Sequence, residues 1–164
     1  MSDTTIDMQK VHHHFAADCF NRTWELIVQR NRTAEQAQQM IHCAHASRWH
    51  WSQVADHTPN NLAIGDWLLA RVYALTERPD EAMSYARPAL QLAVDHDLGP
   101  FFIAYGHEAV ARAAAVADDV ATCSRHTQQM HAAILNITDS EDRDMLLQDL
   151  DAFPIVPPGP AATA

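Results

Sequence analysis

The sequence lacks the features of several large classes of protein. No uninterrupted apolar run is long enough to cross a bilayer, and the first residues, MSDTTIDMQK, do not have the cationic and then apolar layout of a secretory signal. Lys10 is the only lysine, and no basic cluster offsets the formal charge of −10. A partner with a phosphate backbone is therefore not expected. We expect a cytoplasmic protein that binds neither a membrane nor nucleic acid.

Cysteine and glycine are also scarce. Cys19, Cys43 and Cys123 are an odd number at wide spacing, which predicts small buried residues in a reducing compartment and not a disulfide framework. With four glycines and no sustained alternation of apolar and polar residues, nothing predicts a sheet. A glycine-rich phosphate loop, a nucleophile elbow and a zinc-finger spacing are absent as well. The 164 residues suffice for one domain with its own core, which we expect over 1–153, followed by a proline-rich flexible tail over 154–164.

The clearest positive signal is a helical hairpin between residues 61 and 93. The apolar residues of 62–75 fall within one broad face when residues are placed at helical spacing, as in a helix that faces a core. A polar break follows, and then Pro79, which the first turn of a helix accommodates because the N–H there would be unpaired anyway. Asp80 and Glu81 complement the positive end of the new helix dipole.

This hairpin recurs further along the chain. A shift of about 41 residues sets residues 70–74 over 111–115, and it sets the small residue Ala82 over Cys123. A hairpin of this size cannot bury both of its faces alone, so the copies are expected to stack against each other.

The residues of the hairpin resemble the tetratricopeptide repeat. Leu69, Ala70, Tyr73 and Ala82 stand at the large, small, aromatic and small positions of that pattern. Asp66 stands where the family usually has tryptophan, and the spacing is longer than the family's period of roughly 34 residues. The resemblance implies a stack of helical hairpins in which the first helix of each pair lines a concave groove.

Amphipathic patterns and breaks predict the remaining helices. Pro88 predicts a kink or an early end in the fourth helix, and Asn60 or Asn61 is the expected cap of the third. In the first helix, Phe15 falls on the apolar face. We expect an all-α fold of antiparallel helical hairpins, stacked as a short tetratricopeptide-like solenoid with a C-terminal capping helix. Besides the helix that follows residue 61, helices are predicted at about 7–29, 34–55, 79–96, 100–117, 118–137 and 139–153.

The resemblance also implies which residues bind a ligand. Trp67 and Arg71 on one helix, and Tyr105, Glu108 and Arg112 on its copy, take groove-facing positions. Two arginines one repeat apart could hold a carboxylate or phosphate, and Trp67 could stack on an apolar group. The predicted function is a module that needs no cofactor and binds a peptide or protein segment or a small anionic ligand, or that supports formation of a homo-oligomer. In the alternative, Glu108 and Arg112 only pair with each other on the surface.

A second hypothesis uses the eleven histidines of the chain. Imidazoles and carboxylates that project from facing helices hold zinc, iron or manganese in helical bundles. The candidate ligands are His14, Asp18, His42, His45 and His107. They would make the chain a metal-binding protein or an enzyme that depends on a divalent transition metal. Their alternative is a set of solvated surface residues, so the sequence leaves open whether the chain is an enzyme.

Two polar residues are expected inside the helix pairs. The shift of about 41 residues sets Asp66 over His107, and the equivalent positions of the family face the interior of the pair. Buried polar groups need hydrogen-bond partners, so both side chains are predicted to be paired or to belong to a site.

Overall fold

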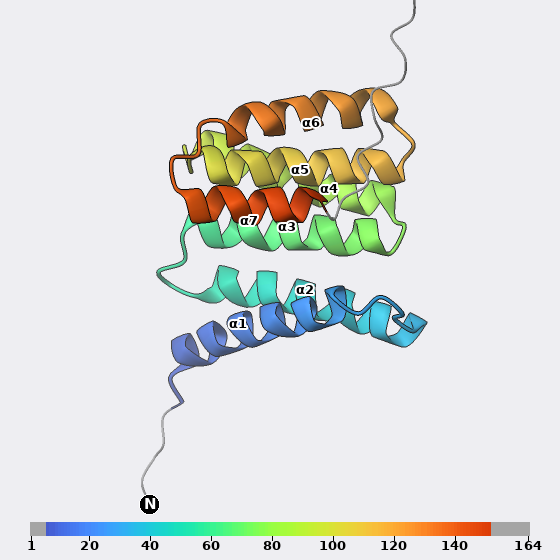
Figure 1. Cartoon of the computed structure of the whole chain (residues 1–164). Coiled ribbons are helices and arrows are strands. Elements are labelled where there is room, and N and C mark those ends of the chain that lie inside the picture. Colours follow the sequence, from blue (N-terminus) through green and yellow to red (C-terminus); the bar gives the residue numbers. More distant parts are fainter. Residues whose placement is uncertain (1–5, 152–164) are drawn as a thin grey trace, which may run out of the picture.

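The computed structural model describes residues 6–151, and all regular structure in that range is helical (Figure 1). The expected end of the last helix at Phe153 and the proline-rich tail at 154–164 lie outside the described residues. No helix within 6–151 is long and apolar enough to cross a membrane. The helices are α1 (Met8–Ile27), α2 (Ala34–Gln53), α3 (Pro59–Leu75), α4 (Pro79–Asp95), α5 (Pro100–Val116), α6 (Val120–Ile134) and α7 (Ser140–Asp151).

The helices stack in chain order from α1 to α6, each in contact with the next (Figure 1). α3 also contacts α5 directly, so the first helices of successive hairpins lie on the same side of the stack. After α6 the chain turns back, and α7 packs on α5. The predicted all-α fold of stacked antiparallel hairpins with a short C-terminal helix is confirmed.

Side chains and prolines mark the starts of the helices, and three consecutive helices, α3, α4 and α5, begin on a proline. α3 begins at Pro59 after Thr58, and the side chain of Asn61 accepts a hydrogen bond from the Thr58 N–H, so the expected cap at Asn60 or Asn61 is wrong. Asp7 and Thr33 cap α1 and α2 with their side chains. The residues that begin α3, α4 and α5 are Pro59, Pro79 and Pro100.

Left-handed residues end α3, α4 and α5. Glu77, Asp97 and Asp118 have φ values of 57°, 48° and 57°. In each turn the N–H of the next residue bonds back to a carbonyl in the last turn of the helix, as from Arg78 to Tyr73 at 3.0 Å. These tight turns reverse the chain and set each following helix antiparallel to the one before.

Alanine dominates the buried positions of α4 and α5, which allows these helices to approach closely. The larger core residues are Leu68, Leu69 and Val72 of α3, as the helical spacing predicts. Phe15, on the predicted apolar face of α1, is 44% exposed, and its ring contacts that of His50 in α2. Of the two outcomes predicted for Pro88, the early end is wrong, because α4 continues to Asp95.

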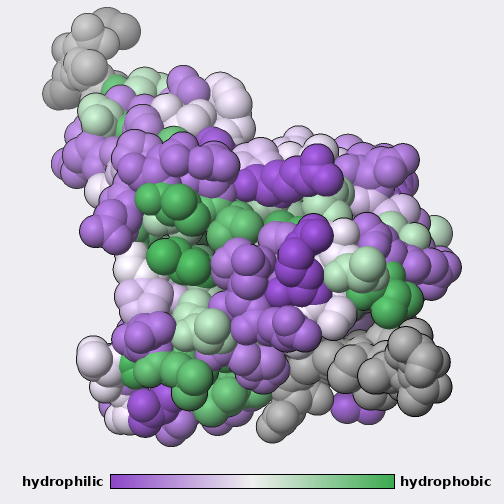
Figure 2. All heavy atoms as spheres, turned by 90° about the horizontal axis from the view of Figure 1, so that it is seen from above, coloured by the Kyte–Doolittle hydropathy of each residue, from purple (hydrophilic) through white to green (hydrophobic). Residues whose placement is uncertain are grey.

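The α6 end of the stack is a mixed surface. Figure 2 shows that apolar side chains there form patches separated by hydrophilic ones. Val120 and Leu135, at the two ends of α6, are among the exposed apolar residues.

Candidate functional site

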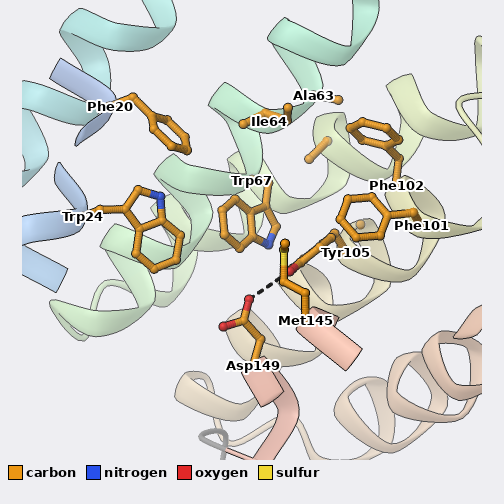
Figure 3. Close-up of a pocket in the computed structure, with 12 residues that line it drawn as sticks. Phe20, Trp24, Ala63, Ile64, Trp67, Phe101, Phe102, Tyr105, Met145 and Asp149 are labelled. Atoms are coloured by element: carbon orange, nitrogen blue, oxygen red, sulfur yellow. Dashed lines mark hydrogen bonds between the residues drawn. The ribbon is translucent and has the colours of Figure 1, made fainter. Parts of the chain in front are cut away.

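A cavity of about 400 Å³ lies on the side of the stack formed by the first helices of the three hairpins (Figure 3). Its walls are almost entirely apolar, and aromatic rings supply most of the bulky side chains. Side chains from α7 close one part of it. The lining residues are Phe20 and Trp24 of α1, Ala63, Ile64 and Trp67 of α3, Ala89 of α4, Phe101, Phe102, Tyr105 and Gly106 of α5, and Met145 and Asp149 of α7.

A continuous row of rings crosses the cavity from α1 to α5. The ring centroids of Trp24 and Trp67 are 5.9 Å apart, and those of Trp67 and Tyr105 are 5.0 Å apart. Phe101, one helical turn before Tyr105 on α5, extends the row, and the centroids of these two rings are 4.9 Å apart. Edge-to-face and tilted contacts of this kind stabilise aromatic clusters and present an apolar surface. We call these four residues the aromatic row.

A buried ion pair lies beside the aromatic row. The Glu108 carboxylate is 1% exposed and accepts a hydrogen bond from Trp67 Nε1 at 2.9 Å. It also accepts from Arg112 Nε at 2.7 Å, and Arg112 Nη2 makes a second contact. Glu108 and Arg112 therefore do pair with each other, but in the interior and not on the surface as the alternative interpretation predicted.

Arg71 occupies the place in α3 that Arg112 occupies in α5, but it has different neighbours. Its guanidinium lies over the rings of Trp24 and Trp67, at 5.0 and 5.5 Å from the centroids. Arg71 is 8% exposed, and its Nε and Nη1 atoms are buried without a hydrogen-bond partner among the described residues. Burial lowers the pKa of Arg71, and the charge of Arg112 adds to this effect, but an arginine remains charged at neutral pH.

The carboxylate nearest to Arg71 comes from α7. Asp149 Oδ2 lies 3.6 Å from Arg71 Nη1, and it accepts a hydrogen bond from the Tyr105 hydroxyl at 2.9 Å (Figure 3). Burial, together with the charge of Asp149, raises the pKa of Tyr105, so its hydroxyl stays protonated and remains a donor. Tyr105 and Arg71 thus form one face that binds a carboxylate.

The structure brings all five predicted groove residues into one contiguous group. Trp67 and Tyr105 line the cavity, while Arg71 packs on two of the lining residues. Glu108 and Arg112 lie behind Trp67 and are paired with each other. Arg112 is paired with Glu108, and Arg71 lies 3.6 Å from Asp149, so the two arginines differ in their present partners.

Of the twelve residues that line the cavity, only Trp67 and Tyr105 were predicted as site residues, and four of the others come from the first and last helices. Phe20 and Trp24 belong to α1, which lies outside the recognised repeat, although their spacing of one turn places both on one face. Met145 and Asp149 have the same spacing on α7. No signal in the sequence says which neighbour that short helix packs against.

The two polar residues expected inside the helix pairs do have partners. Arg48 of α2 donates to both carboxylate oxygens of Asp66, at 2.7 and 3.3 Å. His107 Nδ1 is 3.0 Å from His126 Nδ1 of α6. Burial, with a smaller effect from His126, lowers the pKa of His107 to about 4, so its ring is neutral at pH 7 and the pair shares a hydrogen bond between neutral rings. The expectation of partners is confirmed.

The predicted metal ligands do not converge on one site among the described residues. His14 and Asp18 are exposed on α1, and His42 is exposed on α2. His45 instead bonds to a tyrosine hydroxyl of α3 at 2.8 Å, and His107 is paired as described above. Over residues 6–151, no three or more histidine, cysteine, aspartate or glutamate side chains are grouped so that they could hold a metal ion.

Known proteins give no further indication of the role of this site. No protein-family model matches the chain, and neither a curated protein nor a solved structure is significantly similar to it. The function therefore has to be argued from the cavity and its neighbours.

Proposed function

We propose that this chain is a tetratricopeptide-like binding module whose groove takes a ligand that joins a carboxylate to a large apolar group, either a peptide segment or a small organic acid. The observation that carries the proposal is the position of Arg71, a buried cation at the edge of an aromatic cavity whose Nε has no hydrogen-bond partner among the described residues. The apolar wall and the cation together select a ligand that has both kinds of group.

The cavity supports the apolar half of the ligand. A volume of about 400 Å³ lies within the range of small-molecule sites, which are mostly apolar with a few placed polar groups. Burying one leucine-sized group against such a wall contributes about 1.5–3 kcal/mol. The aromatic row offers this surface across three helices.

Arg71 supports the charged half of the proposed ligand, its carboxylate. A buried donor that lacks an acceptor costs about 1–3 kcal/mol, and a ligand carboxylate would remove this cost by accepting from Nε, since Nη1 already lies 3.6 Å from Asp149. The neighbouring carboxylates of Glu108 and Asp149 disfavour a doubly charged phosphate more than a singly charged carboxylate. We therefore favour an organic acid over a phosphate ester.

The metal-dependent alternative receives no such support from residues 6–151. The candidate ligands His14, Asp18, His42, His45 and His107 would have to converge, and the described side chains do not form a group of three or more that could hold an ion. We therefore base the proposal on the groove.

The direct test is a comparison of decanoate with decanol as probes of equal length. Trp24 and Trp67 line the cavity, so their fluorescence reports on its occupation, and Trp49→Phe removes an exposed indole that lies outside it. At pH 7, decanoate should bind saturably and about tenfold or more tightly than decanol, as expected for one charge-assisted hydrogen bond.

Arg71→Met in the same background is the control. This variant should still bind both probes through the apolar wall but should lose the preference for decanoate. Equal affinities for the two probes in the Arg71 protein, or an undiminished preference in Arg71→Met, would contradict the proposal.

A further inference from the structure

α7 already places a carboxylate and an apolar side chain in the groove. Asp149 and Met145, one helical turn apart, both line the cavity from this helix (Figure 3). Asp149 takes both contacts that a ligand carboxylate would use, the Tyr105 hydroxyl at 2.9 Å and Arg71 at 3.6 Å. α7 therefore has the two chemical groups that the proposed ligand needs.

The attachment of α7 to the rest of the molecule is weak. Of its side chains from 140 to 149, only Leu146 is buried, in a cluster with Ala104 of α5 and with Met130 and Ile134 of α6. Met145 is 53% exposed although it borders the cavity. An isolated helix of 12 residues is marginal in water, so α7 depends on these few contacts.

α7 also leaves part of the groove uncovered. It packs on α5, whereas the cavity continues past it to Phe20 and Trp24 of α1. A helix with a further apolar side chain would reach these rings and make contacts that α7 does not make. The groove thus fits a longer apolar face than the one α7 presents.

We propose that α7 is a resident occupant of this groove, and that the partner of the chain is an acidic amphipathic helix that takes its place. This inference rests on the proposed function and names the partner of the same site. The partner carries a bulky apolar residue and a carboxylate one turn later, the pattern of Met145 and Asp149. α7 itself carries five carboxylates and one arginine, so it has the acidic character that the inference assigns to the partner.

A tethered helix competes with a free one at a high effective concentration. A substitution that weakens the contact between α7 and the groove should therefore allow a separate peptide with the sequence of α7 to bind more tightly. The probe is a fluorescent synthetic peptide with the sequence of residues 139–151, measured by anisotropy with the full chain. Asp149→Ala in the chain should bind this peptide about tenfold more tightly than the unmodified chain, since one charge-assisted hydrogen bond of the resident helix is lost.

Gln148→Ala is the matched control, because Gln148 is exposed on the same helix. It should bind the peptide as the unmodified chain does. A peptide that itself carries the Asp149→Ala change should lose about tenfold in affinity for the Asp149→Ala chain. Amide exchange in α7 of the unmodified chain should accelerate when the peptide is added, since α7 is then displaced.

Leu146→Ser offers a second route to the same result, because it weakens the buried anchor of α7 and leaves Asp149 intact. Unchanged peptide affinity in both Asp149→Ala and Leu146→Ser chains that retain their helical circular dichroism would overturn the inference. If decanoate still binds in an Arg71-dependent manner in that case, the groove is a site for small acids and α7 is only structural. If decanoate fails as well, the proposed function falls with it.

Discussion

Arg71 and Arg112 show how a single position of the repeat can acquire two roles. Trp67 lies four residues before Arg71 in α3, and Glu108 lies four residues before Arg112 in α5. The shift of about 41 residues aligns the two arginines, and it also aligns Trp67 with Glu108. The glutamate binds its arginine, whereas the tryptophan supports its arginine through the ring face. With tryptophan in place of glutamate, Arg71 has no carboxylate on its own helix turn, and its Nε is left without a hydrogen-bond partner among the described residues.

This difference predicts effects of different size on stability. Arg112→Met should lower the free energy of unfolding by about 3–5 kcal/mol, because it leaves the buried carboxylate of Glu108 without its cation. Arg71→Met should lower it by less, about 1–2 kcal/mol, because its contact with the partly exposed Asp149 is 3.6 Å long and Asp149 keeps the hydrogen bond from Tyr105. Urea denaturation at pH 7 measures both values.

The double variant Glu108→Gln with Arg112→Met is the control for the first value. The amide oxygen still accepts from Trp67 Nε1, and the unpaired charge is gone, so most of the lost stability should return. Equal losses for Arg71→Met and Arg112→Met would contradict the assignment of different roles.

The sequence predicted that the candidate residues on α3 and α5 lie together but not their environment. The recurring register and the one-turn spacing are enough to place Trp67, Arg71 and Arg112 together. Burial depends on what covers them, and the cover is α7, which supplies Asp149. A helix of mixed composition gives no periodic signal for its partner, so this carboxylate could be found only from the coordinates.

At the scale of the elements, two equivalent glycines allow the hairpins to approach. A Cβ atom at Gly106 would lie 2.7 Å from the Cα atom of Leu90 in α4. At Gly65 it would meet Arg48 Cδ at 2.4 Å, which belongs to a flexible side chain. The backbone of α4 cannot move away as an arginine side chain can.

Gly106→Ala should therefore destabilise the protein although alanine favours a helix by about 1 kcal/mol. Overpacking against a backbone atom costs about 1–3 kcal/mol, so a net loss is expected, with a lower melting temperature. Gly65→Ala, the matched substitution in the preceding hairpin, should lose less. A Gly106→Ala protein as stable as the unmodified chain would show that α4 and α5 are not packed as closely as described.

The helices themselves were largely predictable, because prolines and polar breaks mark their boundaries. Pro79 and Pro100 begin helices where the sequence predicted them to begin. Tertiary contacts decide the rest. Phe15 is 44% exposed although its ring contacts His50 of α2, and α4 stays helical through Pro88 despite the missing backbone hydrogen bond.

At the scale of the whole molecule, the stack creates a site that no single hairpin contains. The cavity takes its walls from all three hairpins and from α7, so residues more than eighty positions apart, such as Phe20 and Phe102, face the same space. A ligand in this space contacts every layer of the stack. Its binding is therefore expected to stabilise the fold as a unit, by a free energy that grows with the logarithm of its concentration above the dissociation constant.

The central claim is that Arg71 Nε, which is buried without a hydrogen-bond partner among the described residues, donates to a ligand carboxylate in this groove. Heteronuclear NMR of the arginine Nε–H groups tests it most directly, with the Arg71→Met variant used to assign the signal. On titration with decanoate, the Nε–H signal of Arg71 should shift saturably, while that of Arg112, held by Glu108 at 2.7 Å, should stay in place. A stationary Arg71 signal at decanoate concentrations that saturate the tryptophan fluorescence would contradict the claim.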